Sequence, residues 1–272
     1  MKALILNGSL EGDATGERVR AALMSKLQKR GWETEHVLLR EKKIGNCAGD
    51  FYCWIRSPGI CNVDDDNRDI ADAVVHADLL VYLTPVTFGG YSSTLKHMVD
   101  HQIQNILPFF AQVHGETHHA KRYRHYADFL AVGWLEAPDP QAEALFHNLA
   151  ARNGLNFYAK TAVSGIVTAR QGDAELHTAA QGWLDDLQAR KSTRAGELLR
   201  IAPQTVDGTI KRAVLLVGSP RTHKSSSGAL GSYLFAQLAK QDVQTETFYV
   251  HTCLRSPRAW QRCSTPWIPR TW

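Results

Sequence analysis

The chain has 272 residues, of which 44% are hydrophobic and 21% charged, and its formal net charge is +4. This is the composition of an ordinary soluble globular protein, and its length suits one α/β domain plus something smaller. No apolar run approaches the roughly 18 residues that a membrane span needs, so we expect no membrane partner.

The hydrophobic pattern alternates between short apolar runs and amphipathic segments. It predicts, in chain order, a strand at 2–7, a helix from about 17 to 30, a strand near 35–39, a cysteine-bearing loop over 44–66, a helix at 67–76, a strand at 79–84, a helix from about 92 to 103, a strand at 129–133, a helix at 141–152, a strand at 159–167 and a helix near 173–190. Such alternation predicts an α/β fold with a doubly wound five-stranded parallel sheet, flavodoxin-like, of order 2-1-3-4-5.

The beginning of the chain returns near its end. Lys2-Ala3-Leu4-Ile5-Leu6-Asn7-Gly8-Ser9 reappears 210 positions later as Arg212-Ala213-Val214-Leu215-Leu216-Val217-Gly218-Ser219. The second copy predicts a strand at 213–217, a helix at about 228–240 and a strand at 243–250, followed by an irregular tail at 254–272. We therefore expect a first domain over 1–190, a linker over 191–210, and an incomplete second flavodoxin-like unit, a partial βαβ repeat, over 211–272. Because this piece cannot cover both faces of its strands, its apolar residues should pack on the first domain or on a partner.

Charge and cysteine content bear on location and partners. Residues 211–272 hold nine Lys or Arg against two Asp or Glu. An exposed tail accounts for this excess of positive charge better than a nucleic-acid arm, so nucleic acid is not an expected partner. The same tail contains Trp260, Trp267 and Trp272. Five cysteines, an odd number, indicate reduced thiols. With no signal-peptide pattern at the N-terminus, we expect a cytoplasmic protein.

Two glycine-rich loops mark the expected binding site. In an open parallel sheet, ligands bind beyond the carboxyl ends of the strands, where the winding direction switches. For the order 2-1-3-4-5 that point lies between the first and third strands, from which the loops 8–16 and 84–91 emerge. A glycine loop before a helix leaves N–H groups free to hold an anion, usually a phosphate.

The second of these loops carries a family resemblance. Thr84-Pro85-Val86-Thr87-Phe88-Gly89-Gly90-Tyr91-Ser92-Ser93-Thr94-Leu95-Lys96-His97-Met98-Val99-Asp100 resembles the segment after the third strand in NADPH-dependent FMN reductases. Cys53-Trp54-Ile55-Arg56-Ser57-Pro58-Gly59-Ile60-Cys61, with Asp64-Asp65 following, is similar to the cysteine-loop branch that includes iron–sulfur flavoproteins. The resemblance covers about residues 1–190, and Gly218-Ser219-Pro220-Arg221 also matches the phosphate loop of the family.

The resemblance implies bound FMN, with NAD(P)H as co-substrate. By position, the phosphate would lie on Gly8, Ser9, Leu10 and Thr15. The isoalloxazine ring would be lined by Pro85, Val86, Thr87, Phe88 and Gly89, and closed on its other side by Gly133 and Trp134. Hydride transfer is then the chemistry of the cofactor, so no catalytic residue of the protein is expected. The resemblance also implies a homodimer and a small-molecule electron acceptor.

Four residues depart from the family pattern. Glu11 stands where the family usually has Arg, and Asp13 adds a second carboxylate beside the expected phosphate. Like charges there oppose binding, by about 1 kcal/mol if exposed. Thr87 replaces a Tyr and His101 replaces an Arg. A flavin-less binding module with the same fold therefore stays an alternative.

Cysteines and histidines raise the question of a metal. Cys47, Cys53 and Cys61 are separated by five and seven residues, and Asp50 stands where cluster-binding relatives have another Cys. This pattern favours a structural loop over an iron–sulfur cluster, so we expect no metal, with a redox-active thiol pair as a further alternative. His114, His118, His119 and His125 are interpreted as a solvated basic loop, with a contact at the rim of the active site as the second choice.

The function that we expect from the sequence is that of an FMN-dependent NAD(P)H oxidoreductase. It would reduce a quinone, a free flavin or another small acceptor. The alternatives are an iron–sulfur flavoprotein that carries electrons, and the flavin-less binding module.

Overall fold

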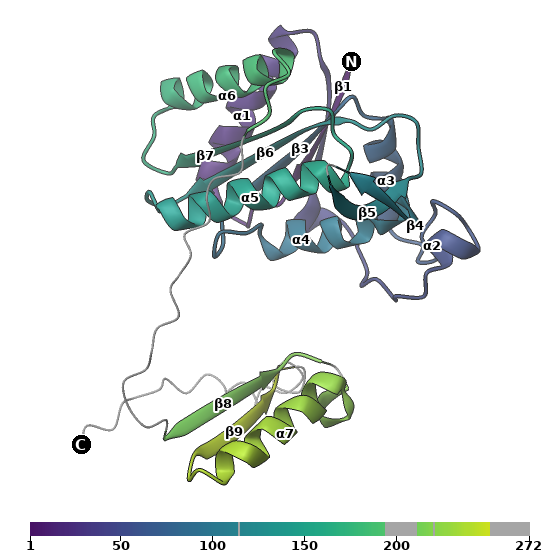
Figure 1. Ribbon diagram of the computed structural model, residues 1–272. Helices are drawn as coiled ribbons and strands as arrows, with labels where there is room; N and C mark the ends of the chain where they lie inside the picture. The colour runs from purple at the N-terminus through teal and green to yellow at the C-terminus, as the bar shows by residue number, and fades with distance from the viewer. Residues whose placement is uncertain (114, 194–210, 220, 251–272) are drawn as a thin grey trace. The chain divides into compact units, whose positions relative to one another are not determined.

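The computed structural model describes residues 1–113, 115–193, 211–219 and 221–250. The chain divides into two compact units, residues 1–200 and 201–272 (Figure 1). The predicted linker at 191–210 and the tail at 254–272 fall mostly or wholly outside the described residues, as does His114.

The first unit is built on a parallel sheet. Its strands are β1 (Lys2–Asn7), β2 (Glu33–Leu38), β3 (Leu79–Pro85), β6 (Asp128–Leu135) and β7 (Ala162–Thr168), in the order β2-β1-β3-β6-β7. Each neighbouring pair is parallel. Counting only these five strands, the order is 2-1-3-4-5, which confirms the predicted sheet and its flavodoxin-like class.

Helices cover both faces of this sheet. Figure 1 shows α1 (Ala14–Lys29) and α6 (Asp173–Gln188) over one face, and α4 (Ser93–Asp100) and α5 (Pro140–Asn156) over the other, which α3 (Asn67–His76) also covers. The short helix α2 (Tyr52–Ile55) and the 3-10 turns η1 (Leu39–Glu41) and η2 (His101–Asn105) lie in the connections.

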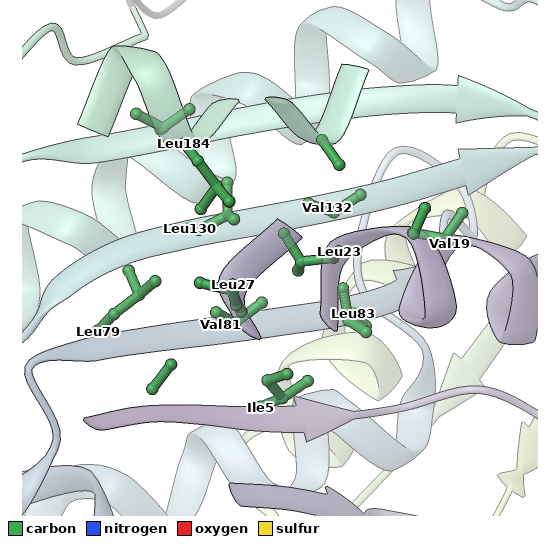
Figure 2. Close-up of a cluster of buried hydrophobic side chains, with 14 of the residues drawn as sticks. Ile5, Val19, Leu23, Leu27, Leu79, Val81, Leu83, Leu130, Val132 and Leu184 are labelled. Carbon is green, nitrogen blue, oxygen red and sulfur yellow. The ribbon is translucent and has the colours of Figure 1, made fainter. Parts of the chain in front are cut away.

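Side chains alternate between two cores along each strand. Ala3 and Ile5 of β1 pack with α1 and α6, whereas Leu4 and Leu6 pack with α3 and α4. Figure 2 shows the first core, where Leu23 and Leu27 of α1 meet the sheet. Since side chains of successive strand residues point to opposite faces, a strand covered on both sides needs the continuous apolar run that β1 has.

The sequence prediction was wrong about the region between α4 and β6. Residues 106–121, part of which was interpreted as a solvated basic loop, form the antiparallel hairpin of β4 (Ile106–Val113) and β5 (Glu116–Lys121). His118 lies in β5 and is only 8% exposed, with its ring nitrogens hydrogen-bonded to Asn156 Oδ1 and Glu116 Oε2. Its neighbour His119 contacts the carbonyl of Leu107 across the hairpin. These histidines are therefore fixed parts of the fold.

The second unit is a βαβ piece. β8 (Arg212–Val217) and β9 (Gln244–Tyr249) pair in parallel, and η3 (Thr222–Lys224) and α7 (Ser226–Ala239) connect them. Leu215 faces α7, where a Cβ on Gly231 would meet it at 2.2 Å. Val214 and Leu216 are 59% and 67% exposed, although their counterparts Leu4 and Leu6 are fully buried. The repeat thus reproduces the strand, the helix and the next strand of the first unit within the described residues.

Candidate flavin site

Three loops meet at the carboxyl edge of the sheet, where the winding switches between β1 and β3. The N–H of Gly8 donates to the carbonyl of Leu83 over 2.8 Å, and the hydroxyl of Ser92 donates to the carbonyl of Gly8 over 2.8 Å. The N–H of Val86 donates to the carbonyl of Trp134 over 2.9 Å. These bonds hold the loops after β1, β3 and β6 against one another. The structure thus brings the predicted phosphate and ring residues to one edge.

The loop between β1 and α1 offers N–H groups to an anion, although not from every predicted residue. The N–H of Ser9 donates to Oδ1 of Asn7 over 2.9 Å, and the Ser9 hydroxyl donates to the same oxygen. The N–H groups of residues 10, 11, 12, 14 and 15 have no hydrogen-bond partner among the described residues. Leu10 and Thr15 therefore keep the free N–H groups that were predicted for phosphate binding, whereas both polar groups of Ser9 are already engaged.

Asp13 occupies the N-terminus of α1. It is the N-cap residue, and its Oδ1 accepts from the N–H of Gly16 over 2.9 Å. Its Oδ2 accepts from the indole Nε1–H of Trp134 over 3.0 Å. A carboxylate is stabilised at this end of a helix by the free N–H groups and by the helix dipole. The predicted helix began at residue 17, so the sequence interpretation missed this cap, although Asp before an amphipathic run is an N-cap signal.

Charged side chains surround the same loop. Arg40 donates through Nη1 to the carbonyls of Ser9 and Leu10, at 3.3 Å each. Glu17 pairs with Arg20, whose hydrogen bond lowers the pKa of the Glu17 carboxyl. Burial lowers the pKa of His36, which lies on the β2 side of the loop. A cavity of about 270 Å³ opens there, and its ionisable lining residues are Asp13, Glu17, His36 and Arg40.

The loop after β3 forms a ridge of backbone at Pro85–Gly89. Thr87 and Gly90 exchange two backbone hydrogen bonds of 2.9 Å, which close a tight turn around Phe88 and Gly89. Both residues at the tip have positive φ, 51° for Phe88 and 76° for Gly89. At Gly89 a Cβ would also meet Leu145 at 2.6 Å, so glycine is required there. The Phe88 side chain is 99% exposed and is available to a ligand or to a partner chain.

Gly133 and Trp134 support this ridge from below. A Cβ on Gly133 would lie 2.5 Å from Val86 and 3.0 Å from Phe146, so glycine lets the loop approach β6. The Trp134 side chain is 5% exposed and packs against α1 at Gly16. That both residues also contact a flavin stays a prediction.

The cysteine loop lies beside α3 and η2. Trp54 anchors it, because its indole N–H donates to the carbonyls of Ile103 and Ile106, both at 3.0 Å. Cys47, Cys53 and Cys61 line a cavity of about 30 Å³ together with Asp50 and His101. Burial lowers the pKa of His101, which stands where the family usually has Arg, so this position supplies no permanent cation.

This cavity does not fit an iron–sulfur cluster. Its volume leaves room for a few water molecules at most. Asp50, at the place of the missing cysteine, has its two carboxylate oxygens on the N–H of Tyr52 and on the Asn62 amide, at 3.0 and 3.4 Å. Among the described residues, no three His, Cys, Asp or Glu side chains are placed to hold a metal ion.

The sheet order and its helices define a flavodoxin-like protein, and the candidate flavin site lies at the carboxyl edge of the sheet. The sequence profile of the NADPH-dependent FMN reductases matches residues 1–165. The chain belongs to this family of flavin-dependent oxidoreductases. FMN, with NAD(P)H as co-substrate, is therefore confirmed at the level of the family.

Individual curated relatives match only part of the chain, and at low sequence identity. An iron–sulfur flavoprotein of Methanosarcina thermophila is 27% identical over 103 residues, which are 38% of this chain and 53% of that protein. One from Archaeoglobus fulgidus is 33% identical over 95 residues, 35% of this chain and 47% of that protein. The chain thus spans about half the length of these curated relatives.

Solved structures agree on the fold. A putative quinone reductase from Klebsiella pneumoniae superimposes with a TM-score of 0.52 at 13% identity, over 69% of this chain and 85% of that one. An NAD(P)H:quinone oxidoreductase from Methanothermobacter marburgensis gives 0.50 at 13% identity, over 70% and 96%. No helix in the described part of the chain is long and apolar enough to cross a membrane.

The residues present fit FMN in part. Five open N–H groups at the start of α1 and a glycine-bearing ridge after β3 suit a phosphate and a flat ring, respectively. The Asp13 carboxylate, however, shares the helix N-terminus with any phosphate that binds there.

Proposed function

We propose that this chain is an FMN-dependent NAD(P)H oxidoreductase that reduces a quinone, a free flavin or another small acceptor. Family membership carries the proposal, and the meeting of the loops after β1, β3 and β6 at the switch point supports it. When bound, FMN would supply the hydride-transfer chemistry between NAD(P)H and the acceptor.

The protein would bind and orient the cofactor. The N–H groups of Leu10 and Thr15 would hold the phosphate, with Gly8 and Ser9 shaping the loop below it. Pro85–Gly89 would lie along the ring, fixed by the hydrogen bond from Val86 to Trp134 and by the close approach at Gly133. Phe88 and Leu10, 99% and 53% exposed, provide apolar surface at the same edge for an acceptor or for the second chain of a homodimer.

Spectroscopy and turnover test this function. The purified chain mixed with FMN should retain the near-ultraviolet and blue absorption bands of a flavin after gel filtration. It should then oxidise NADPH or NADH in the presence of a quinone. A folded chain that neither retains flavin nor quenches flavin fluorescence would be the flavin-less binding module instead.

The curated relatives favour one other candidate, an iron–sulfur flavoprotein that carries electrons. The cavity at the cysteine loop argues against it, as described above. Changing Cys47, Cys53 and Cys61 together to Ser should leave the flavin content nearly unchanged, and elemental analysis of the unaltered chain should find well under one iron per chain. Stoichiometric iron that is lost in the triple variant would establish the second candidate.

A further inference from the structure

The Asp13 carboxylate is fixed at the place where the family binds a phosphate. Both of its oxygens accept hydrogen bonds, one from Gly16 and one from Trp134. Swinging the carboxylate away would leave the indole N–H of Trp134, a side chain 5% exposed, without a partner. Asp13 is therefore a permanent part of the loop.

The charges near the loop compensate only in part for the carboxylates at residues 11 and 13, because Arg40 is the one nearby cation without an ion pair among the described residues. Glu11 is exposed and has no hydrogen bond or ion pair among the described residues. Arg40 contacts the loop, but it donates to carbonyl oxygens on the side where Asp13 and Glu17 also line the cavity. Arg20 is paired with Glu17, and burial favours the neutral form of His36. A dianionic phosphate would thus approach two carboxylates at residues 11 and 13.

The second copy carries the corresponding loop, two residues longer up to the N-cap of its helix, with different charges. There the N-cap of α7 is Ser225, whose hydroxyl oxygen accepts from the N–H of Gly228 over 3.0 Å. This repeats the contact from Gly16 to Asp13 with a neutral side chain. Arg221 follows Gly218-Ser219-Pro220 in the position that Glu11 holds after Gly8-Ser9-Leu10. The fold therefore tolerates a neutral cap and a cation in this loop, and the first copy carries two acids instead.

From this we propose that the flavin site of the first unit does not select for the 5′-phosphate, and that it accepts riboflavin at least as well as FMN. The inference rests on the proposed function, since it concerns the ligand of the same site. The ridge at Pro85–Gly89 serves the ring, which the two flavins share. Only the phosphate meets Glu11 and Asp13, so only FMN is disfavoured by them.

Flavin titrations of the full chain test the proposal. Quenching of flavin fluorescence should give a Kd for riboflavin equal to or below that for FMN at low ionic strength. Asp13→Asn keeps the side-chain oxygen that caps α1 and removes the charge. Combined with Glu11→Arg, it should tighten FMN binding about tenfold or more, with a gain that shrinks as salt is added. Riboflavin binding should change less than about twofold, because riboflavin carries no charge that the variants can attract.

A matched control separates local from overall charge. Asp185→Asn makes the same change in α6, where Asp185 pairs with Arg30 at the far end of α1. It should leave the preference between the two flavins unchanged. If Asp13→Asn impairs folding, Glu11→Arg alone tests the same point, because the Glu11 side chain is exposed.

Each result is decisive. An unaltered chain that binds FMN more tightly than riboflavin at low ionic strength overturns the inference and leaves the proposed function standing. A salt-insensitive FMN affinity in the double variant also overturns it, because the phosphate must then lie elsewhere. Absence of binding by either flavin, in the unaltered chain and in both variants, overturns the proposed function as well.

Discussion

The indole N–H of Trp134 donates to the carboxylate of Asp13 over 3.0 Å, joining the end of β6 to the beginning of α1. The two residues lie 121 positions apart. The same Trp134 accepts from Val86 through its carbonyl, so one residue connects the expected phosphate loop with the expected ring-binding loop. A substitution at Asp13, Val86 or Trp134 should therefore alter both loops.

Trp134→Phe should destabilise the protein through this bond. A hydrogen bond to a charged acceptor contributes about 1.5–3 kcal/mol, and the variant leaves Asp13 with one partner fewer. Urea unfolding should show a loss of this size, and the loss should be smaller in a chain that already carries Asp13→Asn, since the two residues are coupled. Trp183→Phe is the control, because no hydrogen bond of its indole is found among the described residues. Equal losses with and without the Asp13→Asn change would contradict the coupling.

Gly133→Ala should disturb the ring-binding loop. The added Cβ would lie 2.5 Å from Val86 and 3.0 Å from Phe146, and such overpacking costs about 1–3 kcal/mol. Because Val86 belongs to the ridge, flavin affinity should fall together with the unfolding free energy.

Gly182→Ala in α6 is the matched change, since a Cβ there meets no atom within 4 Å. That variant should gain about 0.5–1 kcal/mol, as alanine does over glycine in a helix. A fully stable Gly133→Ala chain with normal flavin affinity would show that the loop does not depend on this contact.

The fold was largely predictable because its strands carry clear signals. Buried parallel strands such as β1 and β3 need unbroken apolar runs, and amphipathic helices separate them. The hairpin of β4 and β5 was missed for the opposite reason. Pro108 interrupts β4, Phe109 and Phe110 are both 70% exposed, and β5 reads Glu-Thr-His-His-Ala-Lys, so neither strand shows the expected alternation.

The meeting of the two glycine-rich loops was predictable, but their contacts with each other were not. Strand order placed loops 8–16 and 84–91 at the same edge, as found. The contact of Asp13 with Trp134 depends on the register of β6 and on the first turn of α1. Thr15 and Gly16 were assigned to the glycine-rich loop 8–16, and this hid the cap at Asp13. The glycine is needed there to admit the Trp134 ring.

Low pH should weaken the contacts of Glu116 with Arg152 and His118, which hold the β4–β5 hairpin. Hydrogen bonds from Arg152 and His118 lower the pKa of the Glu116 carboxyl from 4.5 to about 2. A lowered pKa in the folded state means that the stabilisation is present above about pH 4.5 and is lost as the pH falls toward 2. The effect should be modest, because Glu116 is exposed to solvent.

Thermal unfolding of Glu116→Gln should therefore depend less on pH in this range than that of the unaltered chain. Glu136→Gln, which removes a carboxylate with no ion pair among the described residues, should keep the original dependence. A Glu116→Gln profile that parallels the unaltered one would exclude Glu116 as the titrating group.

The first unit continues past α6. Strand β7 is at the edge of the sheet, and Ser192 and Thr193 cover that edge. The N–H of Ala162 donates to Ser192 Oγ over 3.1 Å, and the N–H of Thr193 donates to the carbonyl of Ala162 over 2.9 Å. The N–H of Ser164 donates to Thr193 Oγ1 over 2.9 Å. A chain shortened to end at Arg190 loses all three bonds and bares an edge strand, whereas one that ends at Thr193 keeps them.

Both shortened chains should bind one flavin and oxidise NAD(P)H, because every residue assigned to the site precedes Arg190. The chain ending at Arg190 should be less stable than the one ending at Thr193 by about 1.5–4.5 kcal/mol, since each of the three hydrogen bonds contributes about 0.5–1.5 kcal/mol. Thermal unfolding, flavin content and NAD(P)H oxidation measured side by side separate these effects. If the chain ending at Thr193 is folded by circular dichroism but has lost the flavin that the full chain binds, then residues of the second unit complete the site. In that case the second copy would take part in flavin binding.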